Sequence, residues 1–88
     1  MSAPAFTLQV PAEAPYRLLA RDVVTRYLEG QGLDAGQCAA CAARVEQAMA
    51  DVASGADTLE CVVSRDTAAV DVTVSGAGRQ TRVRQLLS

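Results

Sequence analysis

The chain has 88 residues, half of them apolar, which suits a single small domain with a thin core. One Phe, two Tyr and no Trp leave Leu, Val and Ala to build that core. Eight arginines against ten acidic residues give a net charge of −2, which argues against nucleic acid as a general partner.

The first two predicted elements are a short strand and a helix. Residues 6–10, FTLQV, alternate apolar and polar side chains, which predicts a strand that Pro11 ends. Pro15 suits the first turn of a helix, where its missing N–H has no partner to lose, and we expect this helix to run to about Glu29. The apolar side chains expected on its buried face are Tyr16, Leu19, Ala20, Val23, Val24, Tyr27 and Leu28.

The best-defined predicted element is a long amphipathic helix over residues 34–53. Its apolar residues recur at offsets of three, four and seven, which places them on one buried face: Cys38, Cys41, Ala42, Val45, Ala48, Met49 and Val52. Asp34 and Gln37 have the spacing of a capping box, in which each side chain satisfies a free backbone N–H. Gly55 suits the helix stop.

Two alternating stretches after this helix predict an antiparallel hairpin over residues 57–75. Its core-facing residues are Leu59, Cys61 and Val63 in the first strand and Val70, Val72 and Val74 in the second. We expect residues 79–88 to form a solvated tail that carries arginines. Within it, Val83, Leu86 and Leu87 have the spacing of a short helical turn.

The predicted fold is therefore an α+β two-layer sandwich, with two helices packed on one face of a sheet. The element order is β-α-α-β-β with a short C-terminal helical turn. We expect one domain over residues 1–88, with a core of about 6–78 followed by the tail.

Several residue types are missing, and their absence excludes classes of chemistry. There is no His, so no histidine base or histidine metal ligand exists, and no Lys, which excludes a Walker-type phosphate loop. Three cysteines are too few for a secreted disulfide scaffold. No leader pattern opens the chain, and no stretch reaches the roughly 20 apolar residues of a membrane span. We therefore expect a cytoplasmic protein.

The order of the predicted elements resembles the front part of the ATPase domain that histidine kinases share with anti-sigma-factor serine kinases, the histidine-kinase-like (GHKL) family. The resemblance spans roughly residues 6–78. It includes VPAEAP after the first strand, YLEGQGLD between the helices, the central helix, and the hairpin that leads into a pair of glycines.

In that family the central helix carries a Glu and, four residues later, an Asn that holds magnesium beside the ATP phosphates. The stretch EQAMADV places Gln47 and Asp51 there, on one helix face. Gln47 cannot act as a base because an amide takes up no proton near neutral pH, whereas the Asp51 carboxylate could bind a cation. A shifted alignment makes Glu46 the base but leaves Ala50 as the magnesium residue. Neither alignment supplies both groups.

The second family motif is Asp-x-Gly-x-Gly, whose Asp reads the adenine amino group. Residues 74–78, VSGAG, keep Gly76 and Gly78 but have Val74 in place of the Asp, and valine offers adenine no hydrogen bond. Taken alone, the glycines are explained by the end of a strand. The family's lid and further glycine-rich loop need more chain than residues 79–88. The resemblance thus implies a shortened relative that is not an enzyme, with weak or no ATP binding.

The family's anti-sigma members bind protein partners as well as phosphorylating them, so we expect a regulatory domain that needs no cofactor and keeps a protein-binding surface. A sigma-factor regulator is one kind of partner, and neither nucleic acid nor membrane is expected. The first candidate surface is a polar stripe on the outward side of the central helix, Arg44, Gln47 and Asp51; the second is the tail, with Arg79, Arg82 and Arg84. A homodimer through an exposed apolar helix face or the hairpin edge is a further possibility.

The alternative function comes from a second resemblance. Residues 38–75 resemble heavy-metal-associated domains, the family of the copper chaperones, and the closest part of the match is CAACAARVEQAM, residues 38–49, which is similar to their metal loop and first helix. In that family two thiolates hold Cu(I) and pass it to a partner's cysteines. Cys38 and Cys41 would be the ligands. Against this, the family has a Met where this chain has Gly36, and the cap at Asp34 places both cysteines inside a helix, where they pack as small apolar side chains.

Overall fold

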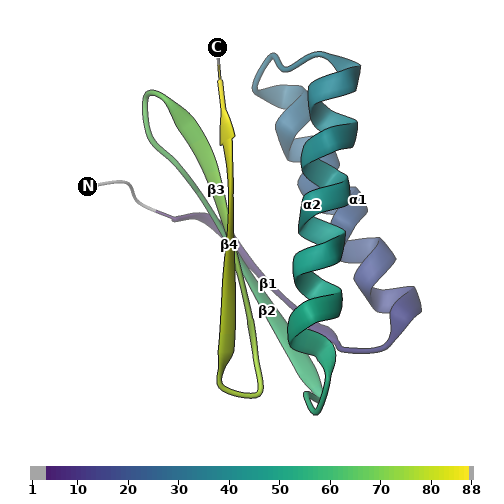
Figure 1. Cartoon of the computed structure of the whole chain (residues 1–88). Helices are drawn as coiled ribbons and strands as arrows, with labels where there is room; N and C mark the ends of the chain where they lie inside the picture. Colours follow the sequence, from purple (N-terminus) through teal and green to yellow (C-terminus); the bar gives the residue numbers. More distant parts are fainter. Residues whose placement is uncertain (1–3, 88) are drawn as a thin grey trace.

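The computed structural model describes residues 4–87, which form two helices and a four-stranded sheet. The elements follow the chain as β1 (Pro4–Pro11), α1 (Ala14–Gly30), α2 (Ala35–Ala53), β2 (Thr58–Arg65), β3 (Ala69–Gly76) and β4 (Arg79–Leu86). Both helices lie on one face of the sheet, and the other face is open (Figure 1). The predicted two-layer α+β fold and its antiparallel hairpin are confirmed.

The sheet is fully antiparallel, and its strands lie in chain order from β1 to β4. Because side chains alternate along a strand, every second residue faces the helices and the others face the open side. In one inner row, for example, Leu8 pairs with Cys61, Cys61 with Val74, and Val74 with Thr81. β1 and β4 are the two edges of the sheet.

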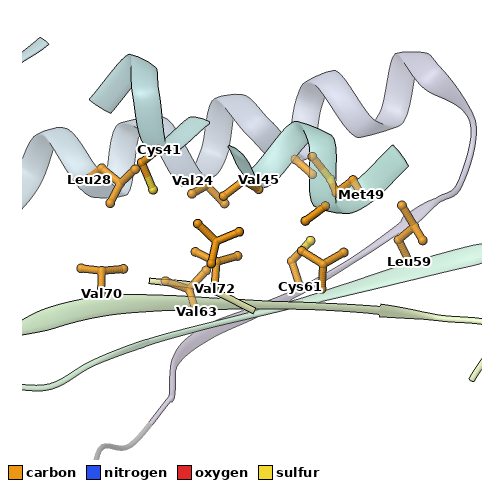
Figure 2. Close-up of a cluster of buried hydrophobic side chains, with 14 of the residues drawn as sticks. Val24, Leu28, Cys41, Val45, Met49, Leu59, Cys61, Val63, Val70 and Val72 are labelled. Carbon is orange, nitrogen blue, oxygen red and sulfur yellow. The ribbon is translucent and has the colours of Figure 1, made fainter. Parts of the chain in front are cut away.

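The core fills the space between the helices and the inner face of the sheet (Figure 2). It consists of aliphatic and sulfur-containing side chains that are fully or almost fully buried, among them Val24, Leu28, Cys41, Val45, Met49, Leu59, Cys61, Val63, Val70 and Val72. The aromatic side chains lie at its margin, where the rings of Phe6 and Tyr27 meet edge to face with centroids 5.3 Å apart.

α2 forms as the sequence predicts. The Asp34 carboxylate accepts a hydrogen bond from the Gln37 backbone N–H at 2.7 Å, and the Gln37 side chain accepts one from the Asp34 N–H at 3.1 Å. All seven residues expected on its apolar face are buried. The chain leaves the helix through Gly55, whose φ of +78° is readily adopted by glycine.

The predicted length of α1 agrees with the structure, but only part of its predicted buried face is in the core. Ala20, Val24 and Leu28 are buried, as expected. Tyr16, Leu19 and Val23 are 41%, 58% and 42% exposed, so this half of the expected face is not in the core. The reason is position: α1 packs against α2 and β1 at one side of the domain, which leaves one flank of its apolar surface uncovered.

The predicted C-terminal helical turn and solvated tail are wrong, because residues 79–86 form β4. Ala77 and Gly78 both have positive φ, 51° and 78°, and make a two-residue turn that brings the chain back along β3. Val83 is buried in the core, whereas Leu86 is exposed. Neither helix within residues 4–87 is long and apolar enough to cross a membrane.

Candidate functional site

The two residues at the magnesium-site positions of the first resemblance lie on the exposed side of α2. Gln47 Nε2 donates a hydrogen bond to Asp51 Oδ1 at 2.9 Å, as their four-residue spacing allows. This single hydrogen bond joins two exposed side chains of one helix face. In the shifted alignment, Glu46 is the base, but its carboxylate forms an ion pair with Arg21 of α1 at 2.5 Å and joins the two helices.

The glycine motif has a structural explanation at each of its positions. Val74 is fully buried in the core, where an apolar side chain is required. Gly76 is crowded, because a Cβ there would lie 2.8 Å from Leu59 Cδ2 and 3.2 Å from Ala56 Cβ. Gly78 supplies the positive φ of the β3–β4 turn. Fold geometry therefore accounts for all three residues without a nucleotide.

The sequence did not predict a hollow of about 430 Å³ on the open face of the sheet, next to this turn. It is lined by Gln9, Thr58, Glu60, Ser75, Gly76, Gly78, Arg79 and Gln80. Four of these residues form a single cross-strand row, Gln9, Glu60, Ser75 and Gln80. Strand alternation places the first three of them on the outward face, but only the pairing register shows that they are neighbours.

The cysteines are core residues. Cys41 and Cys61 are completely buried and Cys38 is 3% exposed, and α2 is already helical three residues before Cys38. Burial raises the pKa of all three thiols, to about 11 for Cys61. The Cys38 thiol lies 3.8 Å from the Leu33 carbonyl oxygen, to which it donates. Because metals bind the thiolate, these surroundings disfavour the ligand form.

No group of three or more Cys, Asp or Glu residues within residues 4–87 is arranged to hold a metal ion. A pair of cysteines is enough for Cu(I), but both thiols would have to leave the core to reach it. The arrangement of Cys38 and Cys41 therefore favours packing as their role.

The two surfaces predicted for protein binding meet at one edge of the molecule. Arg44 of α2 donates to the Arg84 carbonyl oxygen at 3.3 Å and to Gln85 Oε1 at 2.8 Å. At the other end of β4, Arg79 donates to the Asp51 carbonyl oxygen at 3.3 Å. The polar stripe of α2 thus runs beside β4. We call Arg44, Gln47, Asp51, Arg79, Arg82 and Arg84 together the α2–β4 edge.

Two arginines of the α2–β4 edge belong to the open face of the sheet. Arg84 forms ion pairs with Asp71 at 3.0 Å and with Asp66 at 3.6 Å. Backbone N–H groups of the β2–β3 turn, together with Arg84, hold the pKa of Asp66 below its usual range. Arg82 occupies the next position on the same face, opposite Thr73, and is exposed. Pairing of β4 with β3 brings the backbone of these residues to the sheet edge next to α2, while their side chains lie on the opposite face of the sheet.

No family model, no curated protein and no solved structure matches the chain.

Proposed function

We propose that this chain is a non-catalytic, protein-binding regulatory domain, similar to a histidine-kinase-like ATPase that no longer binds nucleotide. The observation that supports this proposal most is the α2–β4 edge. It joins exposed polar groups of a helix to an edge strand that carries three arginines and no acidic residue. Edge strands and exposed arginines are both common elements of protein-recognition surfaces.

The surroundings of the former nucleotide positions support the non-catalytic part of the proposal. Gln47 and Asp51 bond to each other, and Val74 is enclosed by the core instead of offering a carboxylate to adenine. Residues 79–86, which follow the glycine pair, pair with β3 as a strand and do not form a lid. A regulator of a sigma factor is the partner class that the resemblance implies.

Calorimetric titration with Mg·ATP tests the loss of nucleotide binding. We expect no saturable heat up to millimolar nucleotide, because neither a base nor an adenine-reading carboxylate is in place. Millimolar or tighter binding would contradict the proposal.

Affinity capture from an extract of the source cells tests protein binding, with Arg82→Glu compared with wild type. Arg26→Glu is the matched control, because it makes the same charge change at an exposed position of α1. We expect a protein that wild type and Arg26→Glu retain and that Arg82→Glu loses. Equal retention by all three proteins would argue against the α2–β4 edge as the binding surface.

A further inference from the structure

The two edge strands of the sheet differ in how open they are to another strand. β1 has an irregular register between Pro4 and Phe6 and ends at Pro11, which lacks a backbone N–H. Irregular register and proline are features that protect sheet edges. β4 pairs with β3 in regular register from Arg79 to Leu86 and contains no proline. β4 is therefore the edge at which a further strand fits.

The turn geometry identifies which backbone groups of β4 point outward. In a two-residue antiparallel hairpin the closing pair, here Gly76 and Arg79, is hydrogen-bonded, and bonded and non-bonded pairs then alternate. The residues of β4 with outward N–H and C=O groups are thus Gln80, Arg82, Arg84 and Leu86. The hydrogen bond from Arg44 to the Arg84 carbonyl oxygen agrees with this assignment, because that oxygen lies on the outer side.

The positive charge along β4 determines which kind of incoming strand is favoured. Arg84 is paired with Asp66 and Asp71, so the cationic character rests mainly on Arg82, with Arg44 and Arg79 beside it. A second copy pairing β4 with β4 would bring arginines opposite arginines, and like charges in that position are destabilising. A strand with alternate carboxylates instead meets the arginines with opposite charge.

We infer that β4 accepts an extended acidic segment of a partner protein as an additional strand, whose alternate carboxylates face Arg82 on the open side of the sheet. This inference rests on the proposed protein-binding function and names the chemistry of the partner. Main-chain hydrogen bonds would supply affinity, and the arginines would select acidic over basic or neutral strands. Arg44 would exchange its bond to the Arg84 carbonyl for a bond to the incoming strand.

The test uses a capped peptide as long as β4, with the sequence TEVETEVT, titrated into the ¹⁵N-labelled domain. Two N-methylated versions carry methyl groups on alternate backbone nitrogens, so that one version blocks the edge facing β4 and the other the edge facing water. We expect amide shifts at Gln80, Arg82 and Leu86, and binding by only one of the two methylated peptides. Arg82→Glu should weaken binding by about tenfold, the loss of one charge-assisted contact, whereas Arg26→Glu should leave it unchanged.

Three results would overturn the inference: no binding of the unmethylated peptide, equal binding of both methylated versions, or equal binding of a peptide with Lys in place of Glu. None of these depends on Mg·ATP or on the captured partner. If Arg82→Glu still loses that partner while the peptide fails, the proposed function stands and the strand-addition mechanism falls. If the peptide fails to bind and Arg82→Glu still retains the partner, both the proposed function and the strand-addition mechanism are contradicted.

Discussion

The two helices have similar apolar patterns in the sequence, but they differ in how much of the apolar face is buried. α2 packs against β2, β3, β4 and α1 and buries its whole apolar face, whereas α1 contacts α2 and β1 and leaves Leu19 and neighbouring residues exposed. α2 also begins with a complete capping box, while the N-cap residue of α1, Glu13, makes no side-chain cap. Periodicity therefore identifies a helix and one possible buried face, but the position of the helix over the sheet decides how much of that face is covered.

The largest expected effect separates the two helices directly. Met49→Ala removes a fully buried side chain of α2 and should lower the free energy of unfolding by about 2–5 kcal/mol, because it leaves a cavity between helix and sheet. Leu19→Ala, the matched truncation on the exposed flank of α1, should change it by less than about 0.5 kcal/mol. Urea unfolding of both variants provides the comparison. Equal losses would contradict the exposure of Leu19 on the flank of α1.

A smaller effect is expected where the C-terminal end of α2 meets the sheet. Gly76→Ala should cost about 1–3 kcal/mol by overpacking, because the new Cβ would press on Leu59 and Ala56. Gly30→Ala at the end of α1 is the control: a Cβ there meets nothing within 4 Å, and the substitution should be neutral or stabilising by up to about 1 kcal/mol. If Gly76→Ala behaves like its control, Gly76 is not retained for packing.

The smallest expected difference in stability is between substitutions at the N-caps of the two helices. Asp34→Ala should cost about 1 kcal/mol, because it removes the carboxylate that accepts the Gln37 N–H. Glu13→Ala, at the corresponding position of α1, should have almost no effect, because the Glu13 side chain makes no capping bond. Thermal unfolding of both variants measures the difference. Equal shifts in Tm would remove the contrast between the caps.

Much of the fold could be predicted from local patterns in the sequence. The capping residues, the apolar spacing of α2 and the two alternating stretches of the hairpin each determine structure over a few neighbouring residues, and the structure confirms them. The exposed flank of α1 could not be predicted, because it depends on which strand lies beneath the helix.

β4 was missed for a different reason. Its open-face positions include Arg82 and Arg84. The positions that face the helices are Arg79, Thr81, Val83 and Gln85, so the apolar signal on that side is reduced to one buried valine. The turn at Ala77 and Gly78 was the clue that a further strand follows. Because the α2–β4 edge exists only once β4 has paired, the sequence yielded its residues as two separate candidates.

The proposed function requires Cys38 and Cys41 to be core residues of α2 and not exposed metal ligands, and the reactivity of the thiols in the native protein tests this requirement most directly. At neutral pH we predict that no thiol reacts at the rate of a free cysteine, because all three are buried and their pKa values are raised. In denaturant all three should react at once. Fast labelling of Cys38 and Cys41 in the folded domain would contradict the account and favour the Cu(I)-binding function.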